Sequence, residues 1–347
     1  MVSKVYESVN VLNFNNNNIS RIKKPLPESL HTFLCNKNRI TEFTKNHIPR
    51  SLEVLQCCFN EITNFEQGIL SPILSELYCN NNKLVKFSKN SLPSTLKILW
   101  CQNNKISKFE RGSLKNNLVQ LYCYNNELTD FSLKVLPNSL QSLDCSRNRI
   151  RKLKHLPTNL LFLDCSSNSI SSMILPDSLT VLYCKMNRIR MLGVLPTSLL
   201  ELDCSSNGIV EITKGSLPKG LKYLECRNNF LIEIKNGVLP DSLESLDCRG
   251  NNIIRLENLP RCLQNLLFDE DTVEFIDNVD ISMIRFSIKG YQAVRKLQRR
   301  IRRRFNKRIN CIIKIQRACH NWIWKPFCND GTIGIRPRLD TFELGLK

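Results

Sequence analysis

The sequence predicts a solenoid, a stack of short repeats whose strands form one parallel β-sheet. Cysteines recur eleven times at steps of 19 to 22 residues, and an asparagine stands three residues after each of them. Leucine or a similar apolar residue lies five and two residues before every cysteine, and Ile or Leu lies five residues after it. A period of this length is typical of architectures in which each unit buries its apolar faces only against its neighbours. The cysteines are Cys35, Cys57, Cys79, Cys101, Cys123, Cys145, Cys165, Cys184, Cys204, Cys226 and Cys248.

One unit reads Leu140-Gln-Ser-Leu143-Asp-Cys145-Ser-Arg-Asn148-Arg-Ile150. Its LxxLxCxxNxL pattern resembles the leucine-rich repeat. Eleven clean copies, with one weaker copy at each end, make thirteen units over residues 5–280. The resemblance implies a leucine-rich-repeat solenoid with its parallel β-sheet on the concave side.

Each position of the repeat has a physical role in the coil that we expect. The LxxLxC segment is a strand that pairs with the next repeat about 4.8 Å away. Its leucines and its cysteine point inward, the cysteine as a small apolar residue that fits a narrow space. The asparagine turns the chain, and its amide hydrogen-bonds to backbone groups that the turn buries.

The return arm of each repeat has an apolar anchor and, in most repeats, a Leu-Pro pair. The anchors are Phe43, Phe65, Phe87, Phe109 and Phe131, then the smaller Leu153, Met173, Leu192 and Ile212. Proline fixes φ and has no N–H donor, so we expect extended or polyproline-like return arms. The smaller anchors coincide with the shorter repeats, which predicts a narrower coil in the middle.

The concave sheet is the usual binding surface of such a solenoid. Between the second leucine and the cysteine, successive repeats carry an aromatic run and then a mostly acidic one. We predict that these residues bind a protein partner with a basic-aromatic segment, since aromatic clusters beside charges are typical interaction hot spots. In the alternative interpretation, the acidic residues only solvate the sheet and assist neighbouring loops. The predicted binding residues are Tyr78, Trp100, Tyr122, Tyr124, Asp144, Asp164, Tyr183, Asp203, Glu225 and Asp247.

The net charge of +19 is concentrated near the C-terminus. Residues 285–325 contain fourteen Lys or Arg and no Asp or Glu. Apolar residues recur there at intervals of three or four residues, which predicts a basic amphipathic α-helix after the solenoid. An irregular tail over 326–347 completes the predicted domain organisation.

This predicted helix resembles the IQ motif. The first copy comprises Leu297, Gln298, Arg302 and Lys307, and a poorer second copy comprises Ile315, Gln316, Trp322 and Lys325. The resemblance implies a calmodulin-like partner, which we rank ahead of an anionic membrane or nucleic acid. Two further alternatives are contact with the solenoid itself and a tail that only seals the last repeat.

No catalytic or metal-binding pattern accompanies the repeats, so we predict a non-enzymatic scaffold or adaptor without a cofactor. Thiols spaced one strand apart lie in a line, whereas zinc requires four converging ligands. One alternative is a ubiquitin-ligase-like effector, because the triplet from Cys328 to Asp330 is similar to the CxD loop of bacterial leucine-rich-repeat ligases. About 67 residues follow the solenoid, too few for that family's helical catalytic domain.

The cysteines also predict a location. The chain starts without an apolar core of signal-peptide length and has no stretch long enough to span a membrane, so we expect free thiols in an intracellular protein. The Leu-Pro arms resemble those of bacterial leucine-rich-repeat effectors. The Cys-Asn ladder with a basic tail looks more like repeat proteins of giant amoeba-infecting viruses, which implies the host cytoplasm if the chain is viral.

Overall fold

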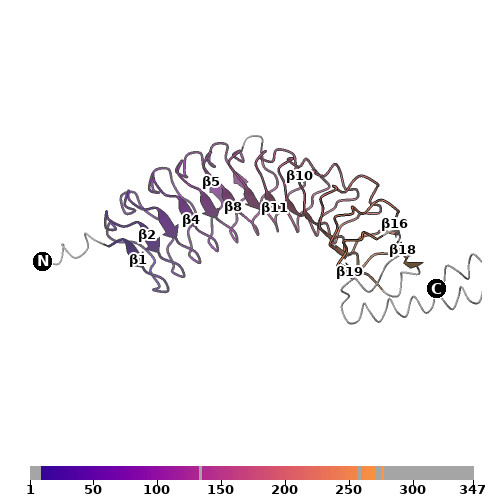
Figure 1. Ribbon diagram of the computed structural model, residues 1–347. Coiled ribbons are helices and arrows are strands. Elements are labelled where there is room, and N and C mark those ends of the chain that lie inside the picture. The colour runs from indigo at the N-terminus through magenta and orange to yellow at the C-terminus, as the bar shows by residue number, and fades with distance from the viewer. Residues whose placement is uncertain (1–8, 133–134, 257–258, 270–274, 277–347) are drawn as a thin grey trace, which may run out of the picture. The chain divides into compact units, whose positions relative to one another are not determined.

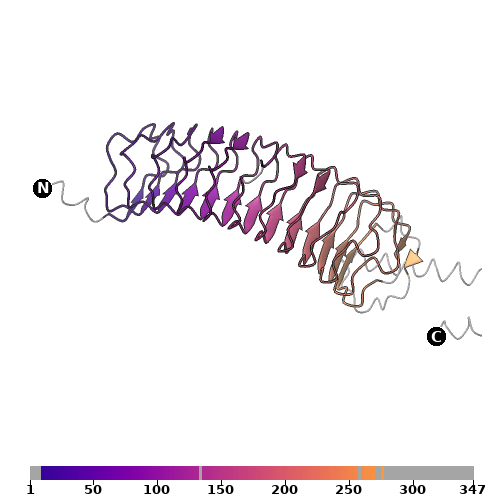
Figure 2. The ribbon, with the colours of Figure 1, turned by 90° about the horizontal axis from the view of Figure 1, so that it is seen from above.

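The structure, a computed structural model, describes residues 9–132, 135–256, 259–269 and 275–276. Thirteen short parallel strands, one per repeat, form a single sheet in the order of the chain. This sheet lines the concave side of the solenoid (Figure 1), and its strands lie side by side in a row (Figure 2). The strands are β1 (Val11–Asn13), β2 (Thr32–Leu34), β3 (Val54–Gln56), β4 (Glu76–Tyr78), β6 (Ile98–Trp100), β8 (Gln120–Tyr122), β9 (Ser142–Asp144), β11 (Phe162–Asp164), β13 (Val181–Tyr183), β14 (Glu201–Asp203), β15 (Tyr223–Glu225), β17 (Ser245–Asp247) and β19 (Asn265–Leu267).

The register of this sheet places equivalent residues of every repeat opposite one another. The middle residue of each strand occupies the second leucine position of the repeat, as in the pair Leu77 and Leu99, with Phe33 in its place in β2, and from β2 onward it is buried. The first and third residues point to the concave face, because side chains alternate along a strand. The backbone hydrogen bonds between repeats continue past the strand, where the N–H of Cys57 donates to the carbonyl of Tyr78 at 2.8 Å. The predicted parallel strands and buried cysteines are thus confirmed, but each strand is shorter than the LxxLxC segment and ends at the residue before the cysteine.

The asparagine ladder fastens each turn to the repeat before it. The Asn126 amide donates to the carbonyl oxygens of Cys123 at 3.0 Å and of Cys101, in the preceding repeat, at 3.1 Å. Its Oδ1 accepts from the N–H of Ile106 at 2.9 Å. The same pattern runs from Asn60 to Asn251, so the predicted role of the asparagine is confirmed.

The turn between cysteine and asparagine requires a left-handed residue, a feature that the repeat pattern did not predict. In twelve successive repeats, the residue before the asparagine has a positive φ. Asparagine tolerates this conformation well and glycine best, whereas other residues are strained there. The residues are Asn16, Lys37, Phe59, Asn81, Asn103, Asn125, Arg147, Ser167, Met186, Ser206, Asn228 and Gly250.

A column of phenylalanines fills the convex half of the first repeats. Phe43, Phe65, Phe87, Phe109 and Phe131 stack with ring centroids 5.8 to 6.4 Å apart and nearly parallel planes. Leu153 continues the column as a buried side chain. The anchors of the shorter repeats, Met173 and Leu192, are only half-buried. The core on this side is therefore less completely covered in the middle of the solenoid.

Replacing Phe87 with leucine should lower the free energy of unfolding by about 1.5 kcal/mol, because both stacking contacts of this buried ring are lost while an apolar side chain remains. The urea midpoint at an unchanged slope measures the loss. Phe59, which is half-exposed, provides the control. An equal loss in Phe59→Leu would contradict a specific contribution from the column.

The return arms combine tight turns with very short strands. Two-residue strands pair in parallel on the convex side as β5 with β7 and β10 with β12, and a third small sheet has the order β16, β18, β20. The prolines begin tight turns, since the N–H of Leu140 donates to the carbonyl of Pro137 at 3.1 Å and Leu243 bonds Pro240 likewise. The prediction of extended return arms is therefore confirmed for the two-residue strands. It did not include the tight turns that begin at the prolines. The two-residue strands are β5 (Lys86–Phe87), β7 (Lys108–Phe109), β10 (Lys152–Leu153), β12 (Ser172–Met173), β16 (Glu233–Ile234), β18 (Arg255–Leu256) and β20 (Phe275–Ile276).

The chain divides into two units, Met1–Arg285 and Phe286–Lys347. The solenoid lies in the first unit. The predicted basic helix over 285–325 and the tail over 326–347 lie outside the described residues. Within the described part, no helix is long and apolar enough to cross a membrane.

Candidate functional site: the concave face

The concave face presents two columns of side chains, one from the first residue of each strand and one from the third. All the residues that we predicted in the strands belong to the third column, whereas Tyr124 follows its strand. The first column, which the sequence analysis omitted, adds Glu76, Phe162 and Glu201 beside them. The two-residue periodicity of a strand could have identified it.

The structure brings three predicted aromatic residues into one cluster. The ring of Trp100 lies between Tyr78, at a centroid distance of 5.1 Å, and Tyr122, at 5.2 Å. All three are half-buried, and the indole N–H of Trp100 has no acceptor among the described residues. The Tyr78 hydroxyl donates to Glu76 Oε2 at 2.8 Å. Burial, together with the carboxylate of Glu76, raises the pKa of Tyr78 to about 12.

A second aromatic contact lies three strands further along. The rings of Tyr183 and Phe162 pack nearly at right angles with centroids 5.6 Å apart, and the Tyr183 hydroxyl donates to Glu201 Oε1 at 2.7 Å. Burial and then the Glu201 carboxylate raise the pKa of Tyr183 above its ordinary value. Both aromatic groups thus combine an accessible ring surface with a neighbouring carboxylate.

The acidic residues of the third column accept hydrogen bonds from the backbone just after each strand ends. Asp144 Oδ1 accepts from the backbone N–H and the hydroxyl of Ser146, at 3.0 and 2.7 Å. Asp164 and Asp203 accept from the N–H two residues on in the same way. Burial nevertheless raises the pKa of Asp144, and the adjacent Asp164 adds to the effect. These contacts match the alternative in which the carboxylates assist the neighbouring loops.

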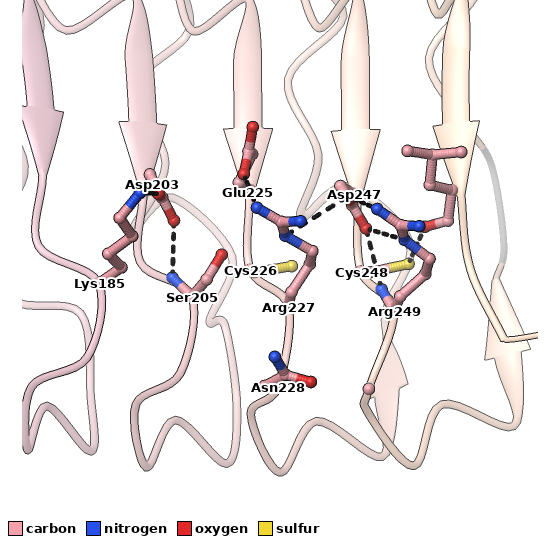
Figure 3. A network of polar contacts seen from close by, with 12 residues as sticks. Lys185, Asp203, Ser205, Glu225, Cys226, Arg227, Asn228, Asp247, Cys248 and Arg249 are labelled. Atoms are coloured by element: carbon pink, nitrogen blue, oxygen red, sulfur yellow. Dashed lines mark hydrogen bonds and ion pairs between the residues drawn. The ribbon is translucent and has the colours of Figure 1, made fainter.

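Further along, cations of this chain already neutralise the acidic side chains (Figure 3). Arg249 donates to Asp247 with Nε at 3.0 Å and Nη2 at 2.6 Å. Arg227 pairs with Glu225 at 2.6 Å and reaches Asp247 at 3.5 Å. Lys185 Nζ lies 3.4 Å from Asp203. The sequence analysis did not pair these residues, although acidic and basic residues two positions apart recur in the repeats.

Comparison with known proteins identifies this architecture. The FNIP Repeat model matches residues 211–247, and the Leucine Rich Repeat model matches residues 242–266. YopM from Yersinia enterocolitica is similar at 27% identity and a TM-score of 0.61, over 81% of this chain and 69% of YopM. The repeat pattern and the superposition agree over four-fifths of the chain. This chain has the leucine-rich-repeat fold.

Two other solved structures are similar to this chain. The functional domain of InlJ from Listeria monocytogenes, which includes a cysteine ladder, is 25% identical with a TM-score of 0.64, over 80% of this chain and 61% of that domain. CroV588, a circular leucine-rich-repeat protein, is 24% identical with a TM-score of 0.52, over 72% of this chain and 42% of its own, and shows the fold alone. No curated protein matches the chain significantly by sequence.

The thiols of the cysteine ladder in this leucine-rich-repeat solenoid are buried and neutral. All eleven ladder thiols are buried, and burial raises the pKa of each. A thiol must ionise to act as a nucleophile or a metal ligand. Among the described residues, no group of three or more His, Cys, Asp and Glu could hold a metal ion. The ladder therefore acts as core packing.

The remaining predicted residues lie outside the described part of the chain. These are the IQ-like residues Leu297, Gln298, Arg302, Lys307, Ile315, Gln316, Trp322 and Lys325, together with the triplet from Cys328 to Asp330. The calmodulin-like partner and the ligase-like alternative therefore stay predictions.

Proposed function

We propose that this leucine-rich-repeat solenoid is a scaffold that binds a protein partner on its concave face. Solenoids of this kind are typically non-enzymatic binding scaffolds, and their concave surfaces are the usual contact area. The observation that carries the proposal is the cluster of Tyr78, Trp100 and Tyr122. Half-buried aromatic rings that pack on one another and keep a surface toward solvent are typical interaction hot spots.

The charges beside this cluster support a basic segment in the partner. Asp144 and Asp164 occupy adjacent strands between Tyr122 and Tyr183. Within the described ranges, neither carboxylate forms an ion pair, whereas Asp203 and Asp247 do. A lysine or arginine of the partner could pair there with the two carboxylates and contact the flanking rings. The acidic residues from Asp203 onward contribute less, because this chain already supplies their cations.

Substituting Trp100 with alanine should weaken binding of the main partner by about thirtyfold or more, as expected for a hot-spot residue. The full-length protein serves as bait in a pull-down, and mass spectrometry identifies the proteins that it retains. Leu34→Ala, in the same column of a distant repeat, is the matched control. A partner retained equally by Trp100→Ala and the wild type, with the fold intact by circular dichroism, would contradict the proposal.

The intracellular location and the likeness to giant-virus repeat proteins remain part of the proposal, as sequence predictions. The same holds for the adaptor role, in which the basic segment over 285–325 would bind a second, calmodulin-like partner. Nucleic acid and anionic membranes are the alternatives for that segment.

A further inference from the structure

One flank of the solenoid exposes an apolar row that neither the core nor the concave face uses. Its residues are the first and third after the ladder asparagine, which point outward while the residue between them is buried. Phe230 and Ile232 are 58% and 59% exposed, and Leu231 between them is fully buried. Val210 and Ile254, at the third position of the repeats on either side, are 56% and 45% exposed.

The row is continuous across three repeats. The N–H of Phe230 donates to the carbonyl of Ile209 at 2.8 Å, and that of Ile254 donates to Ile232 at 3.0 Å. Neighbouring members therefore lie about one strand spacing apart. Scattered apolar side chains on a surface are ordinary, whereas a contiguous group of them marks an interaction site.

A basic band occupies the same positions of the preceding repeats. Arg149 and Arg151 stand in one repeat and Arg188 and Arg190 two repeats further on, all exposed. The repeat between them carries small serines at these positions, and the N–H of Ser171 donates to the carbonyl of Arg151 at 3.3 Å. Arg149 pairs with Glu127 at 3.4 Å. In the described segments, no carboxylate forms an ion pair with the other three arginines.

The charges around the apolar row favour a peptide over a lipid surface. Glu211 and Glu233 directly follow Val210 and Ile232, and both pair with Lys235, at 3.1 and 3.3 Å. Two carboxylates and one lysine leave this group with a net negative charge, so the apolar row lacks the basic surroundings that attract an anionic membrane. A protein segment, by contrast, can place its acidic residues over the arginines and its apolar residues on the row.

We propose that this flank, formed by the basic band of Arg149, Arg151, Arg188 and Arg190 and the apolar row of Val210, Phe230, Ile232 and Ile254, binds a segment of a protein partner in which acidic residues adjoin apolar ones. The two parts together span five repeat steps, about 24 Å, which an extended peptide covers with about seven residues. This surface is separate from the concave aromatic cluster. It therefore provides a second contact of different chemistry.

The test selects phage-displayed random twelve-residue peptides on the full-length protein. We expect enriched sequences that join an acidic group to an apolar group within about seven residues. A fluorescein-labelled synthetic copy should bind at least tenfold more weakly to the double variant Arg188→Glu, Arg190→Glu, and to the double variant Phe230→Ser, Ile232→Ser. Because these side chains are exposed, thermal melting of both variants should stay close to that of the wild type.

Two controls separate this flank from other surfaces. Lys105→Glu reverses an exposed charge at the same repeat position elsewhere, and Trp100→Ala removes the concave aromatic residue; both should bind the peptide like the wild type. Equal weakening in either control, or binding insensitive to the double variants, would overturn the proposal. Binding of the protein to vesicles with 30% phosphatidylserine would also overturn the proposal if Phe230→Ser, Ile232→Ser abolished it, because the occupant would then be a membrane. Self-association in the ultracentrifuge that the same double variant abolished would do so too, because the occupant would then be a second copy.

Discussion

Raising the pH from 9 to 10 should lower the free energy of unfolding by about 1 kcal/mol for each buried ladder thiol, and by roughly 10 kcal/mol for all eleven. Burial raises the pKa of every ladder cysteine in the folded protein, to about 12 for Cys204 and Cys248 and higher for others. In the unfolded chain, the same thiols ionise near pH 9. A loss of this size equals the whole stability of an ordinary domain.

The sign follows from proton binding. Above pH 9, the folded state keeps thiol protons that the unfolded state releases, so a rise in pH favours unfolding. The stability from the ladder is thus fully present below pH 9 and is lost as the pH rises toward the folded-state values. Cys123, which is completely buried between Cys101 and Cys145, illustrates the cause, since no cation compensates a thiolate there.

Urea unfolding followed by circular dichroism at several pH values, in excess reductant, measures the effect. The midpoint should change little between pH 7 and 8 and fall steeply from pH 9. Cys204→Ala should reduce the slope of the unfolding free energy against pH by an amount equivalent to about one proton, since it removes one buried thiol. A midpoint that stays constant from pH 8 to 10 would contradict the assignment of the ladder as buried, neutral thiols.

Replacing Asn126 with alanine should cost about 4 kcal/mol, the largest loss that we expect from a single substitution. The change leaves the N–H of Ile106 and the carbonyls of Cys101 and Cys123 without their side-chain partner. Each buried group that loses its partner costs about 1 to 3 kcal/mol. Urea unfolding at pH 7 measures the loss.

Two comparisons make this test specific. Asn126→Asp keeps an acceptor for Ile106 but turns oxygen lone pairs toward the two carbonyls, so we expect no recovery of stability. Asn64→Ala, at an exposed asparagine, should change the stability by less than about 0.5 kcal/mol. If the aspartate variant were as stable as the wild type, the amide N–H bonds to Cys101 and Cys123 would not be the reason for the ladder.

The candidate site was predictable only in part. The strand position of Trp100 places it on the concave face in any alignment of the repeats, because side-chain direction follows the two-residue period of a strand. Its packing between Tyr78 and Tyr122 depends on the register of neighbouring strands. Of the two partners of Asp247, Arg249 stands two residues on in the same repeat and could have been paired with it from the sequence. Arg227 belongs to the preceding repeat, and an ion pair between repeats is invisible in a single unit.

The flank shows the same division. Phe230, Ile232 and Ile254 stand at repeat positions where most other units carry polar residues, yet composition alone does not reveal that they form one row. Only the stacking of repeats brings residues about 22 positions apart into neighbouring places and sets Arg188 and Arg190 one repeat before Val210, where the row begins.

The sequence by itself determined the fold of this protein. Its repeat states which residues face inward, and burying them requires each unit to stack in register on the next. The tertiary structure alone decided which surface groups meet: the cluster at Trp100, the neutralised acids around Asp247 and the exposed row at Ile232. The physical reason is that inward positions obey one constraint shared by all repeats, whereas each outward side chain depends on its neighbours in adjacent repeats.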